Sequence, residues 1–237
     1  MLDELNVRKI MVIDIETVPQ YSAYSEVPEN LQTLWEAKTK YQRKPDQTPD
    51  DFYERAGILA EFGKIVCISM GVFQQEEEVC KLRIKSLHGD DETKLLNAFI
   101  QLLKKQHNDL TFCAHNGKEF DYPYLCRRMV VNGLNIPRQL SMSGKKPWEN
   151  PHLDTMELWK FGDYKHYTSL NLLATILNID TPKDDISGSD VRKVYYEDND
   201  LARIVTYCQK DVVTTAQILL KFKGMDTVDK QHITIVS

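Results

Sequence analysis

Short apolar runs alternate with stretches of helical periodicity along most of the chain. A run rich in β-branched residues at 9–15 predicts a buried strand, and further strands are expected at 64–73, 78–84 and 110–114. The helical patterns fall at 28–41, from 48 onward, from 90–92 onward, at 122–131, after Leu153, at 169–177 and at about 200–222. Strands gathered early, with helices among them, predict an α/β fold in which helices flank a mixed β-sheet.

The pattern contains no internal repeat and no linker, so we expect a single domain over residues 1–237. Two segments stand apart from the regular elements. Residues 19–61 form a polar stretch that is longer than a hairpin needs, and we interpret it as an insertion. Residues 224–237 are expected to be a tail, and 141–152 to be a loop because of their Ser, Gly and Pro content.

Composition narrows the class of protein. The 237 residues are 42% hydrophobic and 27% charged, as in ordinary globular proteins. No apolar run approaches the roughly 18 to 20 residues that span a bilayer, and the N-terminus lacks the apolar core of a secretory signal. The five cysteines form no Cys-x-x-Cys pair, which favours reduced thiols. We therefore expect a cytoplasmic protein without a membrane partner.

Two carboxylates lie in the first expected strand. Residues two apart in a strand point to the same face, so Asp14 and Glu16 converge. Burying neighbouring negative charges is costly unless a cation compensates them, and a divalent metal ion is suited to do so. The alternative is that the strand ends here and both carboxylates reach water.

Two more acidic residues lie far along the chain. Asp121 follows the expected strand at 110–114, where it is also suited to cap the next helix. Asp211 lies four residues after Tyr207, on a largely apolar helical face. A core-facing Asp211 needs a counter-charge, whereas its alternative is a surface residue paired with a nearby lysine. Asp154, between a strand end and a helix, is expected to be a cap rather than a ligand.

Together these residues resemble the DEDDy 3′–5′ exonucleases in type and order. The three motifs are Asp14-Ile15-Glu16-Thr17, Asn116-Gly117-Lys118-Glu119-Phe120-Asp121-Tyr122-Pro123-Tyr124-Leu125 and Tyr207-Cys208-Gln209-Lys210-Asp211-Val212. The second and third are most similar to the proofreading exonuclease domain of family B DNA polymerases. A related subfamily has a histidine five residues before the last aspartate, where this chain has Thr206. The resemblance covers residue 9 to about 222 and implies a ribonuclease-H-like fold, here in a stand-alone protein.

The resemblance also implies hydrolysis of phosphodiester bonds with two divalent ions. Mg²⁺ is the expected cofactor because it prefers oxygen ligands, and Mn²⁺ suits the same ligands. By resemblance, Asp14 bridges both ions, Glu16 and Asp211 hold the ion that carries the attacking water, and Asp121 holds the other through water.

The remaining site residues are assigned to positioning. Tyr207 is expected to orient the nucleophilic water, because a neutral phenol is a poor base. Thr17, Asn116 and Phe120 flank the acids, and the resemblance implies contacts to the terminal nucleotide. Phe120 is equally suited to anchor the turn before Asp121.

The net charge of −5 argues against a general attraction to nucleic acid, but two bound Mg²⁺ ions contribute +4 and leave −1. Attraction of the nucleic acid must then come from a few positively charged residues near the site rather than from the net charge of the protein. Lys145, Lys146 and Trp148 combine positive charge with an aromatic ring and suit guiding a strand, although a solvated loop has the same composition. Further cations are Arg127, Arg128, Lys160, Lys165 and His166.

Three functions remain open. We expect the substrate to be the 3′ end of single-stranded DNA; RNA is the alternative with the same site, because contacts to a 2′-hydroxyl cannot be located in the sequence. The third hypothesis is a non-catalytic nucleic-acid-binding module, which the loss of one acid would have favoured. The chain has no room for a polymerase, so we expect it to act alone or in complex with a polymerase or repair partner.

Overall fold

The computed structural model describes residue 2 and residues 5–76, 79–163, 167–180 and 186–236. Within these ranges one six-stranded mixed sheet has the strand order β5-β4-β1-β2-β3-β6. Neighbours β1–β2 and β2–β3 are antiparallel, whereas β1–β4, β4–β5 and β3–β6 are parallel. The strands are β1 Ile10–Pro19, β2 Gly63–Glu76, β3 Val79–His88, β4 Thr111–Ala114, β5 Leu153–Asp154 and β6 Ile233–Val236.

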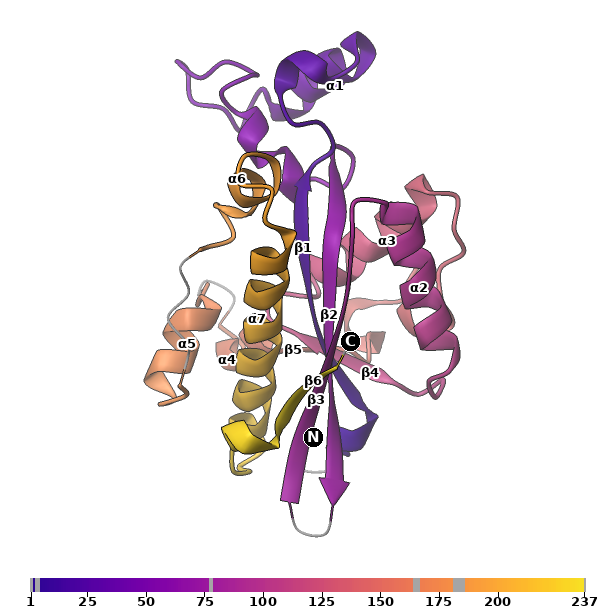
Figure 1. Ribbon diagram of the computed structural model, residues 1–237, viewed down its shortest axis with the longest axis vertical. Helices are drawn as coiled ribbons and strands as arrows, with labels where there is room; N and C mark the ends of the chain where they lie inside the picture. The colour runs from indigo at the N-terminus through magenta and orange to yellow at the C-terminus, as the bar shows by residue number, and fades with distance from the viewer. Residues whose placement is uncertain (1, 3–4, 77–78, 164–166, 181–185, 237) are drawn as a thin grey trace.

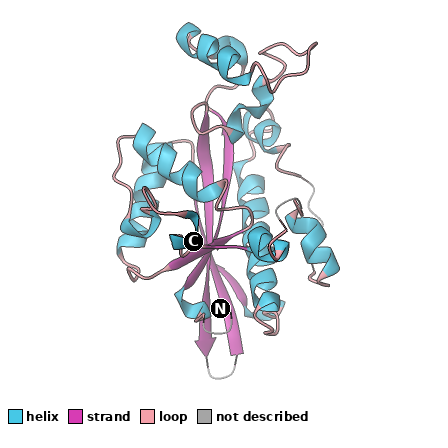
Figure 2. Cartoon of the chain, turned by 180° about the vertical axis from the view of Figure 1, so that it is seen from behind, coloured by secondary structure: helices cyan, strands magenta, loops and turns pink. Residues whose placement is uncertain are grey.

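Helices cover both faces of this sheet (Figure 1). Helix α7 packs along β1, β2 and β3, with α4, α5 and α6 beside it, and α2 and α3 lie on the opposite face (Figure 2). The expected α/β architecture with a helix-flanked mixed sheet is confirmed. The helices are α1 Glu29–Thr39, α2 Glu92–Lys104, α3 Asp121–Val131, α4 Thr155–Lys160, α5 Leu170–Ile176, α6 Val191–Tyr196 and α7 Leu201–Phe222.

The central strand β1 serves two cores because its side chains alternate between the faces of the sheet. Ile10 and Val12 belong to the cluster under α7, whereas Met11, Ile13 and Ile15 belong to the cluster under α2 and α3. All five side chains are buried. The strand is thus fixed from both sides.

The expected helix starts agree with the structure. Asp91 caps α2 through the Lys94 N–H at 3.0 Å, Ser169 caps α5 through the Leu172 N–H at 3.3 Å, and Asp200 caps α7. The five cysteines are free thiols. Of the helices in the described ranges, none is long and apolar enough to cross a membrane.

The insertion at 19–61 forms a lobe beyond the ends of β1 and β2 (Figure 1). Helix α1 packs there on its own apolar cluster around Trp35, whose indole donates to the Pro49 carbonyl at 2.8 Å. The helix expected from 48 onward is wrong: Thr48 does accept the Asp51 N–H at 3.1 Å, but the chain forms only turns and the 3₁₀ segment Tyr53–Ile58. Gly57 of this segment lies against the Val18 backbone, where a Cβ would approach to 3.0 Å, so a contact with β1 fixes the path of the chain here.

Residues 224–236 do not form the expected tail. The chain turns through the 3₁₀ segment Lys230–His232 into β6, which pairs in parallel with β3. The Gln217 side chain holds the return by bonding both backbone groups of Val228, at 2.7 and 2.8 Å. The segment folds back because β6 satisfies backbone groups that β3 would otherwise expose at the sheet edge.

A buried ion pair connects α2 to α3. Arg128 and Glu92 are both nearly inaccessible, and the guanidinium donates to the carboxylate from two nitrogens, the shortest bond being 2.6 Å. Arg128 also donates to the Ala60 carbonyl, and Glu92 accepts the Ile65 N–H. Its position after motif two suggested that Arg128 was available to bind a nucleic acid. The buried ion pair shows that it is not.

We expect Arg128→Met to lower the free energy of unfolding by about 3–5 kcal/mol, because it leaves the buried Glu92 carboxylate without its counter-charge. Urea denaturation followed by circular dichroism measures the change. The neighbouring exposed Arg127→Met is the matched control and should stay within about 0.5 kcal/mol of the wild type. Equal effects of the two substitutions would contradict this account.

Candidate active site

Asp14 and Glu16 continue the even-numbered face of β1 and point toward α7. Apolar neighbours Ile13 and Ile15 occupy the other face, so the two carboxylates are the polar end of an otherwise buried strand. Directly after Glu16, the pairing with β2 shifts by one residue. Bulges of this kind bend a strand and redirect side chains next to functional sites.

Helix α7 brings the third motif against these carboxylates. The Tyr207 hydroxyl donates to the Asp211 carboxylate one turn further along. Both carboxylates of β1 are electrostatically coupled to Asp211. On the same face of α7, Ile204 before these two residues and Thr214 after them are buried. The helical spacing of the sequence predicted this core-facing side.

Cys208 is a member of the cluster that the sequence pattern did not single out. Its sulfur and one oxygen each of Asp14 and Glu16 all lie within 4.8 Å of one another. The thiol donates to the Asp14 backbone carbonyl at 3.4 Å. Its position three residues before Asp211, on the same helical face, was the available signal, but buried cysteines are usually core residues.

Asp121 lies at the start of α3 and is buried. Its side chain accepts the Ile15 N–H of β1 at 3.2 Å, and the structure shows no side-chain cap bond at the preceding residue, Phe120. The interpretation of Asp121 as a plain helix cap is therefore wrong. Its carboxylate bonds to the central strand at Ile15, the residue between Asp14 and Glu16.

Burial and mutual repulsion make the cluster electrostatically unfavourable. Burial, and then the charges of neighbouring carboxylates, raise the pKa values of Asp14 and Glu16 well above their ordinary range. Burial likewise raises the pKa of Asp121 to about 7. Burial and the adjacent carboxylates also raise the pKa of Tyr207, so its hydroxyl stays protonated at neutral pH.

The donor set fits divalent cations that prefer oxygen. The buried Oδ2 atom of Asp14 has no hydrogen-bond partner among the described residues. An unpaired, buried carboxylate oxygen in a group of repelling carboxylates is the environment that a cation stabilises. The carboxylates of Asp14, Glu16, Asp121 and Asp211 are groups of the type that could hold such cations, and the Cys208 sulfur adds a softer donor.

The three residues expected to contact the terminal nucleotide lie around these acids. Thr17 follows the bulge and bonds to Tyr124, and Phe120 packs on Tyr124 with ring centroids 5.2 Å apart. Asn116 has a left-handed backbone, with φ of 64°, and its buried Oδ1 lacks a partner among the described residues. Gly117 is required in this turn, because a Cβ there would lie 2.4 Å from Ala114.

Asp154 holds this turn in place. It caps α4, as expected, by accepting the Met156 N–H at 2.9 Å, and it also accepts the N–H groups of Asn116 at 2.9 Å and Lys118 at 3.1 Å. The bonds that Asp154 accepts from the turn of motif two join segments about 38 residues apart, so local spacing in the sequence could not predict them.

The loop expected to guide a strand presents an exposed aromatic ring. Trp148 is 77% exposed, and the Lys146 ammonium lies 5.3 Å from its ring centroid. The positions of Lys165 and His166, two other expected cations, lie outside the described residues. The loop keeps the composition of a single-strand contact, which stays a prediction.

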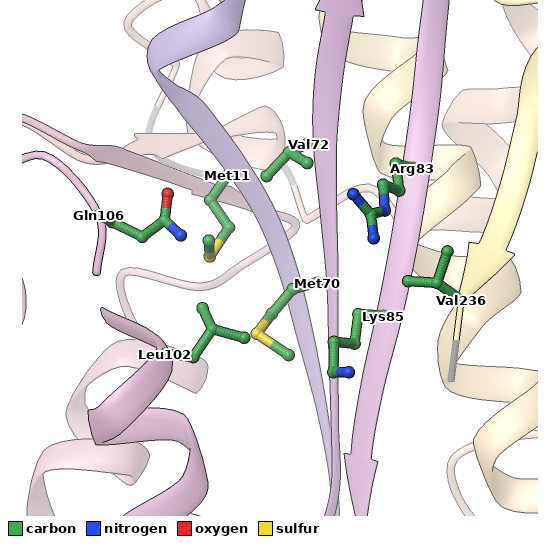
Figure 3. A pocket seen from close by; sticks show the side chains of 8 residues that line it. All are labelled: Met11, Met70, Val72, Arg83, Lys85, Leu102, Gln106 and Val236. Atoms are coloured by element: carbon green, nitrogen blue, oxygen red, sulfur yellow. The ribbon is translucent and has the colours of Figure 1, made fainter. Parts of the chain in front are cut away.

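An apolar cavity of about 170 Å³ lies elsewhere, between the sheet and the end of α2 (Figure 3). Met11, Met70 and Leu102 line it, with Arg83 and Lys85 to one side. It contains no carboxylate from the cluster, so the chemistry of the candidate site does not extend into it.

The helix-flanked mixed sheet and its carboxylate cluster agree with the ribonuclease-H-like fold of exonucleases. Residues 58–234 match the family model of predicted 3′–5′ exonucleases related to the exonuclease domain of PolB, and the chain belongs to this family. The chain thus contains a predicted 3′–5′ exonuclease domain, which is a class of phosphodiester hydrolase.

A DNA polymerase of Pyrococcus glycovorans is 20% identical over 148 residues, which are 57% of this chain and 19% of the polymerase. The chain therefore spans about a fifth of that relative. The family match begins after β1, so Asp14 and Glu16 lie outside it, and the structure places them against the matched segment.

We expect the metal-free protein to lose stability as pH rises. The folded-state pKa values of Asp14, Glu16 and Asp121 lie above their unfolded values, so this contribution is present at low pH and disappears as pH increases through about 7. Mg²⁺ binds deprotonated oxygens, so millimolar Mg²⁺ should raise the melting temperature at pH 8 and hardly at pH 5. Thermal unfolding in EDTA and in Mg²⁺ measures both.

Asp14→Asn removes one repelling charge and should raise the melting temperature in EDTA at pH 8 by about 2–4 °C, the shift that about 1 kcal/mol produces in a chain of this size. The same variant should lose the response to Mg²⁺. Asp226→Asn, at an exposed position, is the control and should behave as the wild type. A wild type that does not respond to Mg²⁺ or Mn²⁺ at either pH would disprove the metal site.

Proposed function

We propose that this protein is a two-metal exonuclease that removes nucleotides one at a time from the 3′ end of single-stranded DNA. The observation that carries the proposal is the convergence of carboxylates from β1, α3 and α7, with a buried, unpaired oxygen on Asp14. Carboxylates that raise one another's pKa values repel each other when ionised, and bound cations remove this repulsion.

Asp14, Glu16, Asp121 and Asp211 are the residues that we assign to holding two Mg²⁺ ions, with Mn²⁺ as a substitute. When bound, the ions supply Lewis acidity for the attacking water and for the leaving oxygen. Asp14 is central in this assignment because it is coupled to each of the other three carboxylates. Glu16 and Asp121 are buried and Asp14 and Asp211 are half-buried, so electrostatic contacts within the cluster are stronger than in bulk water.

Tyr207 contributes a protonated hydroxyl. Its raised pKa excludes a role as general base at neutral pH, so we assign it to orienting the nucleophilic water by a hydrogen bond. The present donation to Asp211 shows that the hydroxyl reaches the carboxylate cluster. Thr17, Asn116 and Phe120 are proposed to contact the terminal nucleotide; the unpaired Asn116 carboxamide oxygen supports a ligand contact.

DNA is favoured over RNA because the family is related to the exonuclease domain of PolB and the relative named above is a DNA polymerase. Single strands are favoured because the cluster lies against the central strand β1 and is partly buried, so the 3′ end must enter it. The proposal includes action alone or with a polymerase or repair partner.

Incubation of 5′-labelled single-stranded DNA with the protein and Mg²⁺ should produce a ladder that shortens stepwise from the 3′ end. EDTA should abolish it, because the carboxylates require cations to act. The same oligonucleotide as RNA is the comparison: faster degradation of RNA would transfer the function to the exoribonuclease alternative. A full-length product without EDTA, in both Mg²⁺ and Mn²⁺, would support the non-catalytic hypothesis instead.

Tyr207→Phe should lower kcat by about ten- to a hundredfold, the range expected when one orienting or acid–base group is lost. Asp14→Ala should lower it by at least about a thousandfold, because metal binding is lost with it. Calorimetric titration with Mn²⁺ should show unchanged metal affinity for Tyr207→Phe only. Equal losses of kcat at equal metal affinity would contradict the separate roles of these residues.

A further inference from the structure

A cavity of about 370 Å³ lies at the start of motif two, apart from the apolar cavity of Figure 3. Asn116 and Lys118 form one side of it, and Lys160 and Gly162, at the end of α4, form another. Neither Lys160 nor Gly162 belongs to the three exonuclease motifs. The cavity therefore joins Asn116, a proposed nucleotide contact, to the end of α4, where Lys160 is one of the cations considered for the nucleic acid.

Strand register places this cavity close to the carboxylates. Val12 of β1 is opposite Cys113 of β4, and Cys113 is opposite Leu153 of β5, all in parallel pairs. Strand β4 ends at Ala114 and β5 at Asp154, so their carboxyl ends lie side by side at one edge of the sheet, next to the middle of β1 and close to Asp14. Two strand spacings separate β5 from β1, which is about 10 Å. A nucleic-acid strand whose 3′ end reaches Asp14 must continue past this edge of the sheet or leave toward solvent.

The wall of the cavity is formed before any ligand binds. Asp154 is buried and accepts backbone N–H groups of Asn116, Lys118, Met156 and Glu157, so its charge is compensated. Such a fixed wall needs no rearrangement to receive a ligand, which lowers the cost of binding.

The charges around the cavity suit a single phosphodiester. Lys118 is paired with Glu157, but Lys160 has no ion-pair partner among the described residues. The exposed Glu119 also lines the cavity. Its carboxylate repels anions, so the cavity favours a ligand with little negative charge. A singly charged phosphodiester beside Lys160 is therefore better matched than a free phosphate ion, and its binding should depend on salt.

Phe161 adds an exposed aromatic ring at the same place. It directly follows Lys160, is 84% exposed, and has a left-handed backbone with φ of 43°. This conformation is unfavourable for a bulky residue and is typically kept where function needs it. The turn is closed by the Asp163 N–H, which donates to the Lys160 carbonyl at 2.7 Å, and continues through Gly162 at φ of 90°. The ring is thus held in solvent, and Phe161 stands in the sequence between Lys160 and Gly162, which line the cavity.

The geometry points to a subsite for an upstream nucleotide of the substrate strand, on the 5′ side of the one being removed. Lys160 pairs with its phosphodiester, and Phe161 stacks on its base, as exposed aromatic rings do in single-strand grooves. The subsite rests on the proposed exonuclease function. It makes single-stranded DNA of two or more nucleotides the preferred substrate, without selecting a base.

Two substrates separate this subsite from the catalytic site. The p-nitrophenyl ester of thymidine 5′-monophosphate contains one nucleotide and cannot occupy an upstream position, whereas 5′-fluorescein-labelled (dT)10 can. We expect Phe161→Asn and Lys160→Ala each to lower the ratio of kcat/KM for (dT)10 to that for the ester by about tenfold, mainly through KM. Asparagine is chosen because it tolerates a left-handed backbone and lacks the ring.

Three further variants test the assignment. Phe161→Tyr keeps an aromatic face and should retain the wild-type ratio. Tyr41→Asn, at another highly exposed aromatic residue, and Lys105→Ala, at another exposed lysine, should also leave the ratio unchanged. Thermal unfolding identifies any variant that has lost its fold, and anisotropy of the labelled (dT)10 in Ca²⁺ measures binding without relying on turnover.

The outcomes are distinct. An unchanged ratio and unchanged anisotropy for Phe161→Asn and Lys160→Ala would overturn the subsite and leave the exonuclease function standing. A wild type that hydrolyses neither substrate in Mg²⁺ or Mn²⁺ would overturn the proposed function itself. A selective loss on (dT)10 in both variants, rescued by Phe161→Tyr, would establish the subsite.

Discussion

The repulsion among buried carboxylates is the constraint on which the arrangement of this protein depends. Asp14 and Glu16 lie in the central strand, and Asp121 and Asp211 approach from helices on opposite faces of the sheet. Left alone these groups raise one another's pKa values and oppose folding. The two apolar cores on either side of β1 offset that cost, so the site is held together by packing around it rather than by contacts within it.

Polar contacts then position the turn of motif two. Asp154 holds the backbone of Asn116 and Lys118, and the bond from the Ile15 N–H fixes Asp121 against β1. Further away, the Arg128–Glu92 pair joins α3 to α2. The bond to Asp121 and the Arg128–Glu92 pair are buried, and the two bonds to Asp154 are partly buried. All of them form within the protein, so the geometry exists before a metal or a nucleic acid binds, as catalysis by electrostatic preorganisation requires.

Periodicity was sufficient for most elements, because strands and helices of this fold have clear apolar patterns and capped ends. It failed where local and distant contacts compete. The segment after Thr48 has a good helix start, yet Gly57 must lie against Val18. The chain after 224 has weak periodicity, yet the open edge of β3 recruits it as β6.

For the site, residue types and their order were enough to predict four acids and a tyrosine, because together they resemble the motifs of the DEDDy exonucleases. The sequence by itself thus determined the kind of reaction. Only the tertiary structure decided that Asp121 bonds to β1 instead of capping its helix, that Cys208 joins the cluster and that Arg128 is buried. The physical reason is distance along the chain: each of these contacts joins residues more than 30 positions apart, and no local pattern encodes such a pairing.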